Sequence, residues 1–247
     1  IPATHNGAAV TQILPGGFSN ATNLKTIVIP DSVTSIGRNA FSNCTDLVSI
    51  DIPESVTIID DAAFSNCTAL MSIDIPEGVT SIGRSAFYGC TSLTEIVIPD
   101  QVTSLGEAAF GGCSGLTSIY IGAGVEYVSL GDPDGLFSYG TPLMKITVSP
   151  ENPVYHSAGN CLIHTESGTL VMGTNSSVIP ADGSVTAIGG YAFRNRTGLT
   201  EIVIPGSVES IGYYAFRGCE KLSSVVIGDG VPSIGPGAFE GCSGLTS

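Results

Sequence analysis

The sequence has few positive charges and no tryptophan. Of its 247 residues only 8 are Lys or Arg, against 22 Asp or Glu, which gives a formal net charge of −14. Affinity for nucleic acids comes from clustered Lys and Arg that neutralise phosphates, so this composition argues against a nucleic-acid-binding protein. The same shortage argues against docking on anionic lipids through a basic patch.

Long apolar runs are also missing. No uninterrupted run approaches the roughly 18 apolar residues of a membrane-spanning helix, although the mean hydropathy is +0.35. Hydrophobic residues make up 43% of the chain, and Ile and Val are frequent among them. A chain of this composition can form a hydrophobic core, which a disordered chain cannot do. We therefore expect a soluble, acidic, β-rich protein with no membrane insertion.

The sequence repeats itself every 23 residues. Phenylalanine marks the period at Phe18, Phe41, Phe64, Phe87 and Phe110, and after an interruption at Phe193, Phe216 and Phe239. The unit that begins at Val33 returns in near-copies at Val56, Val79 and Val102. A fixed period of this length predicts a solenoid of stacked coils, about nine to ten in this chain, in which each coil buries its apolar face against its neighbours.

Each unit contains the pattern of one short strand. In Leu47-x-x-Ile50-x-Ile52 the apolar residues alternate, and Pro53 ends the strand because it lacks an N–H for the ladder. Val33-x-x-Ile36 is a second apolar pair, which we expect to be extended on the return side of the coil. Parallel, in-register strands are expected at 24–29, 47–52, 70–75, 93–98, 116–121, 143–148, 199–204 and 222–227, with a ninth near 178–179. Helix content should be low, with short helical or 3-10 turns near each Ala-Phe pair.

The repeat resembles a known family. The pattern Leu-x-x-Ile-x-Ile-Pro-x-x-Val-x-x-Ile-Gly-x-x-Ala-Phe-x-x-Cys-x-x-Leu is similar to the 23-residue leucine-rich repeat of BspA-like surface proteins. It departs from the commonest leucine-rich repeat in using Ile after the first Leu, and its Cys precedes the strand. The resemblance implies a leucine-rich repeat solenoid on a bacterial or protist cell surface, and many members are linked to adhesion.

The period breaks twice, so we expect a single solenoid over residues 1–247 with irregular insertions at about 129–136 and 150–178. The first contains Gly131-Asp132-Pro133-Asp134-Gly135, which is typical of a loop. In the second, residues 161–164 and 169–172 flank four turn-type residues, which predicts a β-hairpin. The preceding Asn152-Pro153-Val154-Tyr155 resembles an insertion of this family in which a hairpin projects from the coil. The resemblance implies an extra coil that carries a projecting hairpin, either as a functional site or as a tolerated surface excursion. The chain starts without Met and stops within a repeat, so a fragment of a longer protein is expected.

Six of the seven cysteines share one position of the repeat, three residues after Phe. They are Cys44, Cys67, Cys90, Cys113, Cys219 and Cys242. In-register stacking predicts a buried column of reduced thiols that act as small apolar residues. Neighbouring coils are close enough for disulfides, but parallel side chains are poorly oriented for the required torsion. The redox state of Cys161, outside the column, is left open.

Few residues suggest catalysis or metal binding. His156-Ser157 and His164 fall in or near the second insertion, but no nucleophile-elbow or phosphate-loop motif accompanies them. No Cys-x-x-Cys or Cys-x-x-His pair suggests a metal site, so we expect neither catalytic residues nor a cofactor. Glycosylation sequons occur at Asn20, Asn43, Asn66, Asn175 and Asn195, and four of these share one repeat position, as by-products of the repeat would.

The outward positions of the strands form the most promising functional surface. Side chains on either side of the middle Ile point away from the core. They are Thr26, Val28, Ser49, Asp51, Ser72, Asp74, Glu95, Val97, Ser118, Tyr120, Lys145, Thr147, Glu201, Val203, Ser224 and Val226. We call this set the strand face and expect it to bind a protein partner. Stacked Asp51 and Asp74 would repel each other or share a Ca²⁺ ion.

Two classes of function fit this sequence better than an enzyme does. The first is a non-catalytic protein-binding or adhesion module of a secreted or cell-surface protein, whose partner could be a host extracellular or matrix protein. The second is a structural spacer that presents another domain and binds nothing. An enzyme centred on the region from Tyr155 to His164 is a remote third. The ligand and the oligomeric state are not specified by the sequence.

Overall fold

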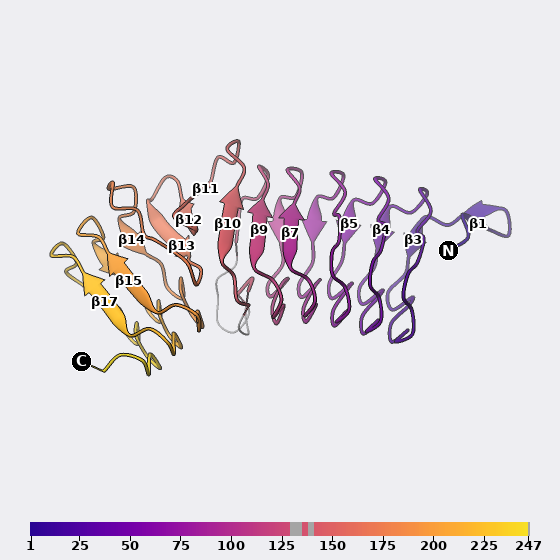
Figure 1. The fold of residues 1–247 in the computed structure, drawn as a ribbon. Helices are drawn as coiled ribbons and strands as arrows, with labels where there is room; N and C mark the ends of the chain where they lie inside the picture. The colour runs from indigo at the N-terminus through magenta and orange to yellow at the C-terminus, as the bar shows by residue number, and fades with distance from the viewer. Residues whose placement is uncertain (129–134, 138–140, 247) are drawn as a thin grey trace. The chain divides into compact units, whose positions relative to one another are not determined.

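The computed structural model describes residues 1–128, 135–137 and 141–246. These form two compact units, Ile1–Ser129 with Pro133–Thr141 and Leu130–Asp132 with Pro142–Ser247. Most of the loop expected at about 129–136 lies outside the described residues. Each unit is a stack of short coils joined by parallel strands, as the 23-residue period predicts (Figure 1).

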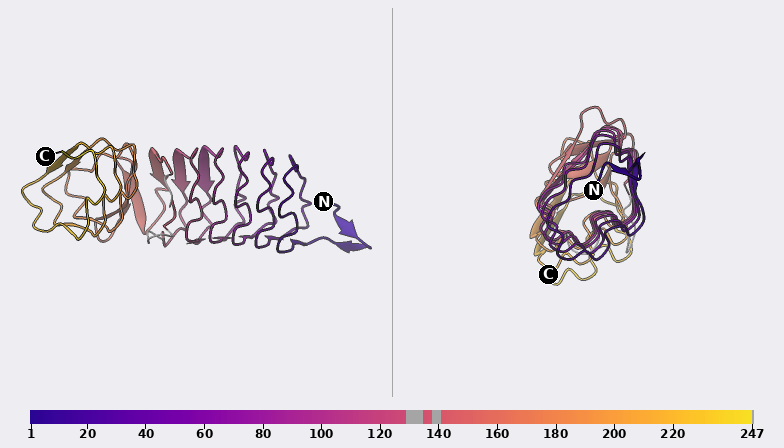
Figure 2. Two further views of the ribbon diagram at one scale, coloured as in Figure 1. Left: turned by 90° about the horizontal axis from the view of Figure 1, so that it is seen from below. Right: turned by 90° about the vertical axis from the view of Figure 1, so that its right-hand side faces the viewer.

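In the first unit the return sides of the coils form a continuous ladder. Its strands are β3 (Gln12–Ile13), β4 (Ser35–Ile36), β5 (Ile58–Ile59), β6 (Ser81–Ile82) and β8 (Ser104–Leu105), and they pair in parallel in that order. Each residue pairs with the one 23 positions later, as Ile36 does with Ile59. Figures 1 and 2 show these coils side by side, starting beyond the hairpin of β1 (Thr4–His5) and β2 (Ala8–Ala9).

The opposite side of the first unit is regular only in its later coils. There β7 (Glu95–Ile98) and β9 (Ser118–Ile121) pair in parallel over four residues. The prediction of paired strands at 24–29, 47–52 and 70–75 is wrong. Among the described residues these ranges form only one isolated bridge, from Val28 to Asp51. Aspartate is disfavoured in strands, and two like charges in neighbouring coils oppose pairing. The coils that carry Asp51 and Asp74 therefore stack without a regular sheet.

The turns around each Ala-Phe pair are not helical, contrary to our expectation. Among the described residues there is no helix of any kind, and therefore none long and apolar enough to cross a membrane. The reason is a left-handed backbone at two places in each turn, for example φ 54° at Asn39 and 59° at Asn43. A right-handed helix cannot continue through such residues.

A stack of phenylalanine rings fills the centre of each unit. In the first unit the rings from Phe18 to Phe110 are nearly parallel, with centroids 5.2 to 5.5 Å apart. In the second unit Phe193, Phe216 and Phe239 stack in the same way at 4.8 and 5.0 Å. Burial of each ring stabilises the folded state, and each stacked pair of rings adds about 0.5–1.5 kcal/mol to this stabilisation. The ring column is therefore a main stabilising feature of the fold.

The second unit incorporates the predicted hairpin. Its strand β12 (Cys161–His164) pairs antiparallel with β11 (Tyr155–Ala158) on one side and with β13 (Thr169–Met172) on the other. The hairpin is thus confirmed, but it does not project. Instead β13 pairs in parallel with β14 (Ala187–Ile188), and β14 with β16 (Ser210–Ile211), so it becomes part of the return-side ladder.

Burial explains why this hairpin is not a surface excursion. Cys161, Ile163 and Leu170 lie in the same core as Phe193. The turn after β13 has no phenylalanine, and a Cβ on Gly173 would overlap the Phe193 ring, which therefore packs against backbone.

The other strands of the second unit are β10 (Lys145–Val148), β15 (Glu201–Ile204) and β17 (Ser224–Ile227), and β15 pairs with β17. The prediction of a ninth strand near 178–179 is wrong. Val178 donates its N–H to Gly159 O and its side chain is 71% exposed. Strands also begin two residues later than expected, because leucines such as Leu93 still belong to the turn and bond back to Cys90 O.

The aligned cysteines form a column of buried hydrogen-bond donors. Each Sγ lies 3.0 to 3.2 Å from the carbonyl oxygen of the phenylalanine in the preceding coil, as Cys67 does from Phe41 O. All seven cysteines of the chain are free. Two other residues take the same role: Thr141 donates to Phe110 O, and Arg196 donates to Gly173 O. The position thus selects a buried donor, whereas the sequence suggested only a small apolar side chain.

The shared sequon position is explained by backbone conformation. Asn20, Asn43, Asn66 and Asn195 all have φ between 56° and 62°, and glycine with positive φ holds the position in other coils. Asparagine tolerates this conformation better than most residues do. The side chains also form a ladder, since Asn66 donates to Asn43 and Asn43 donates to Asn20. Turn geometry therefore accounts for these asparagines without glycosylation.

The donor role of the cysteine column can be tested at Cys67. Threonine and valine have the same shape, but only threonine can donate to Phe41 O, which also accepts from Cys44 N. We expect Cys67→Thr to be more stable than Cys67→Val by about 1 kcal/mol, in the range of one net hydrogen bond. Urea unfolding of the two variants measures the difference. A more stable valine variant would show that the position selects only for apolar volume.

Burial of the thiols also predicts a loss of stability at alkaline pH. Burial raises the pKa of the Cys67, Cys113 and Cys219 thiols from the usual 9.0 to about 12. Between these values the unfolded chain releases protons that the native protein keeps, so the free energy of unfolding falls as the pH rises from about 9 towards 12. Urea midpoints from pH 7 upward measure this decline.

The matched measurement is on Cys67→Thr, which lacks one of these thiols. Its decline above pH 9 should be shallower than that of the wild-type chain. Parallel pH profiles would contradict a contribution from the thiols.

Candidate functional site

The strand face of the first unit points outward, as its sequence pattern indicates. Buried Ile96 and Ile98 in β7 alternate with exposed Glu95 and Val97. Thr26, Val28, Ser49, Asp51, Ser72 and Asp74 are exposed as well, while Ser118 and Tyr120 in β9 are half-buried. The earlier coils keep their side chains on this side without a regular ladder. The face is therefore available to a partner in the isolated chain.

Two exposed apolar side chains beside this face were missed in the sequence. Val48 and Met71 follow the first leucine of their coils and are 39% and 60% exposed. They lie next to the strand-face positions Ser49 and Ser72, and Val28 is 73% exposed. The exposure of these two side chains could have been predicted, because polar residues, Lys25 and Thr94, hold the same repeat position in neighbouring coils. Val48 and Met71 give this part of the first unit a mixed apolar and acidic character.

Within the described part of the chain, the acidic side chains of the strand face have no positive partner. Among the described residues, Asp51, Asp74 and Glu95 make no ion pair and no side-chain hydrogen bond. A second acidic line follows the strands and is exposed at Asp31, Glu54, Glu77 and Asp100. Of these, Asp100 accepts a hydrogen bond from Ala123 N and so stabilises the next coil.

The Ca²⁺ ion considered between Asp51 and Asp74 gains no support from the fold. Calcium takes six to eight oxygen ligands. The described part of the chain contains no group of three or more His, Cys, Asp or Glu side chains arranged to hold a metal ion. Two carboxylates on neighbouring coils supply too few ligands on their own.

In the second unit the strand face is also exposed. Glu201 and Val203 point outward from β15, and Ser224 and Val226 point outward from β17, where both valines are more than half exposed. On β10, Lys145 is exposed and Thr147 is half-buried.

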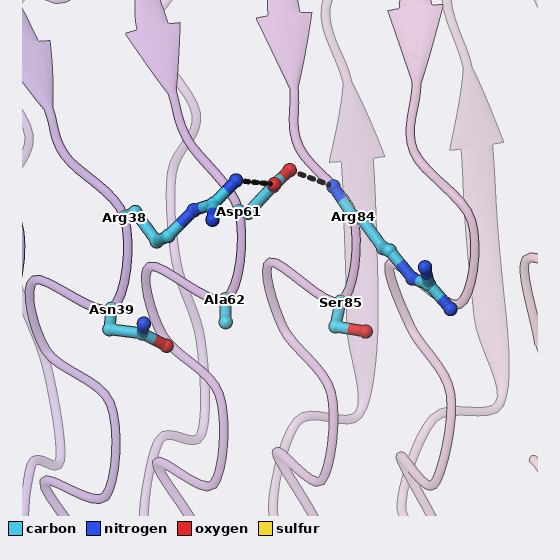
Figure 3. A pocket seen from close by; sticks show the side chains of 6 residues that line it. All are labelled: Arg38, Asn39, Asp61, Ala62, Arg84 and Ser85. Atoms are coloured by element: carbon cyan, nitrogen blue, oxygen red, sulfur yellow. Dashed lines mark hydrogen bonds and ion pairs between the residues drawn. The ribbon is translucent and has the colours of Figure 1, made fainter.

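A charge ladder that the sequence analysis overlooked lies at the turns of the first unit. Arg38 donates to Asp61 at 2.7 Å, and Asp61 also accepts from the backbone N–H of Arg84 at 2.8 Å (Figure 3). Arg84 in turn faces Glu107 at 3.9 Å. The signs alternate at one repeat position, which a 23-residue alignment could have revealed. A depression of about 340 Å³ is lined by Arg38, Asn39, Asp61, Ala62, Arg84 and Ser85. Figure 3 shows how these six side chains lie.

This ladder fits a structural role better than a binding role. Asp61 and Glu107 each already face an arginine of a neighbouring coil. Exposed ion pairs of this kind contribute about 0–1 kcal/mol each. Their alternating signs favour the register in which the coils are stacked.

The histidines of the hairpin do not form a nucleophile–base pair. Nδ1 of His164 accepts from the backbone N–H of Ser167 and lies 3.1 Å from its Oγ, but this hydroxyl donates to Thr169 Oγ1 at 2.8 Å. His156 contacts Thr165 Oγ1 at 3.2 Å through Nδ1. An activated serine would direct its proton to the histidine ring. The polar contacts instead hold the hairpin turn.

An aromatic cluster in the second unit was also not foreseen. The Tyr191 ring meets those of Tyr213 and Tyr214 with centroids 4.9 and 5.7 Å away. Arg194 lies over Tyr191, and Arg217 lies over Tyr214 at 4.9 Å from its centroid. Tyr213 occupies the repeat position of the charge ladder of the first unit, and Tyr191 and Tyr214 occupy the next position. These turns can therefore link coils through rings as well as through ion pairs.

Comparison with known proteins supports this architecture. The chain matches the BspA type leucine-rich repeat region in six copies, over residues 11–148 and 172–247. None of the curated proteins matches the chain in sequence. The unmatched residues 149–171 include β11, β12 and all of β13 except its last residue.

Solved structures of bacterial proteins share the fold. A leucine-rich repeat protein from Bacteroides ovatus is 28% identical, with a TM-score of 0.56, and the match covers 100% of this chain and 73% of that one. A leucine-rich cell surface protein from Faecalibacterium prausnitzii is 26% identical, with a TM-score of 0.54 and the same coverage. The pneumococcal vaccine antigen PcpA is 20% identical, with a TM-score of 0.76, and the match covers 100% of this chain and 70% of that one. At this identity the likeness shows the fold alone.

The matched repeats cover most of the chain, and their period is the one that sets the stacking of its coils. The chain belongs to the BspA-type leucine-rich repeat family.

Proposed function

We propose that this chain is a non-catalytic protein-recognition module that acts on the surface of a cell or in a secreted protein, where it serves in adhesion. The observation that carries the proposal is the exposed strand face. In the first unit Val28 and Val97 are 73% and 55% exposed on it, and in the second unit Val203 is 59% exposed, in each case among charged and small polar residues. Exposed apolar side chains on the outward face of a unit favour a protein partner.

The setting of the relatives supports a surface location. The Faecalibacterium prausnitzii relative is described as a cell surface protein. Leucine-rich repeat solenoids offer an extended surface on which a partner can touch several coils at once. A host extracellular protein is the partner class that fits an adhesion module.

A display experiment tests the proposal. The full chain is immobilised and random peptides displayed on phage are selected against it. Clones are then measured on Ser49→Gln/Ser72→Gln/Val97→Gln, which places long neutral side chains on the strand face. We expect their affinity to fall at least about tenfold, the equivalent of about 1.4 kcal/mol.

The matched control is Thr57→Gln/Thr80→Gln/Thr103→Gln, which changes three exposed residues on the return side of the same unit. Its affinity should stay close to that of the wild-type chain. Clones that lose affinity equally on both variants would contradict a specific role of the face. Failure to enrich any clone would favour the spacer function.

A further inference from the structure

Acidic side chains at the turns of the first unit and on its strand face have different neighbours. At the turns, Asp61 and Glu107 each face an arginine of a neighbouring coil. On the strand face, the described residues offer Asp51, Asp74 and Glu95 no such partner. Among the described residues, arginines thus neutralise Asp61 and Glu107 at the turns, whereas Asp51, Asp74 and Glu95 on the strand face stay unneutralised.

The unneutralised acids are unfavourable for the fold itself. Asp51 and Asp74 occupy equivalent positions of successive coils, where like charges destabilise pairing. Their coils lack the ladder that β7 and β9 form with Val97 and Tyr120 at the same positions. A valine or threonine would suit these positions better. Residues that weaken a local structure without a compensating contact point to a role outside the fold.

The same coils expose apolar side chains beside these acids. Val28, Val48 and Met71 are 73%, 39% and 60% exposed. A partner that matched only the charge would leave these side chains in water. A partner that matched both would bury them while placing its cations near the carboxylates.

We propose that the strand face of the first unit, around Asp51, Asp74 and Glu95, binds a protein segment in which Lys or Arg alternates with apolar residues. This inference rests on the proposed protein-recognition function and specifies its partner. Charge complementarity of this kind raises the rate of encounter and selects against acidic partners. The net charge of −14 attracts a cationic segment from a distance as well.

Labelled synthetic peptides test the proposal directly. Three short peptides alternate Leu with Lys, Gln or Glu, and their binding to the full chain is followed by fluorescence anisotropy. The Lys peptide should bind at least about tenfold more tightly than the Gln peptide, and the Glu peptide more weakly than either. Raising the salt concentration from about 0.05 to about 0.5 M should weaken the Lys peptide most.

Two neutralised variants with the same net charge locate the effect. Asp51→Asn/Asp74→Asn/Glu95→Gln removes the acids of the strand face. Asp61→Asn/Glu107→Gln/Glu126→Gln removes three acids elsewhere in the same unit. We expect about a tenfold loss of affinity for the Lys peptide in the first variant and less than about a threefold loss in the second. Circular dichroism melting of both confirms that they fold.

Each remaining outcome has one meaning. Equal losses in the two variants would show that binding follows net charge alone and would overturn the inference. Equal affinity of the Lys and Gln peptides would also overturn it. If in that case the Gln peptide lost affinity for the Ser49→Gln/Ser72→Gln/Val97→Gln variant, the proposed recognition function would stand. The proposal of a cationic partner would not.

Discussion

Hydrogen bonds between coils hold this protein together, because the bonds within a coil are confined to its turns, as from Cys44 N to Phe41 O. Phe41 N donates to Ala63 O in the following coil, and Thr34 N donates to Thr11 O in the preceding one. Each coil is therefore tied to its neighbours in both directions. A shift of one residue would break these bonds and separate the stacked phenylalanine rings. The repeat length of 23 residues is the condition under which all these contacts form together.

This requirement explains why so few repeat positions vary. Val33 and Ile36 are fully buried and fill the return side. The position of Cys67 requires a donor for a buried carbonyl, and the position of Asn66 requires a left-handed backbone. Outward positions carry none of these demands. They vary from Asp to Val to Tyr, which makes them the part of the coil where a binding specificity could be set.

Much of this architecture could be predicted from the sequence. The spacing of the phenylalanines gave the stack, and the β-prone runs around residues 165–168 gave the hairpin, because both are local patterns. The burial of that hairpin could not be seen, since it depends on pairing between β13 and β14. The left-handed turns were hidden because Ala62 and Ser85 are unusual residues for φ values of 52° and 53°.

The candidate site was predictable in part for similar reasons. Alternation of buried and exposed residues identified the strand face, including Glu95 and Val97 in β7. Which acids would meet an arginine could not be read from one repeat, because Arg38 and Asp61 are brought together only by stacking. The exposure of Met71, by contrast, could have been predicted, because the polar residues Lys25 and Thr94 hold the same repeat position in other coils.

The near-identity of the junctions has a consequence for how such a chain changes in length. Phe41, Phe64 and Phe87 meet their neighbours through equivalent ring contacts, with centroid spacings between 5.2 and 5.5 Å. Excision or duplication of one whole unit in this region would recreate a junction of the same kind. Gene recombination between repeats can therefore lengthen or shorten this segment without new packing. The junction of Phe193 with Gly173 has no equivalent elsewhere in the described chain, so this part should resist such exchange.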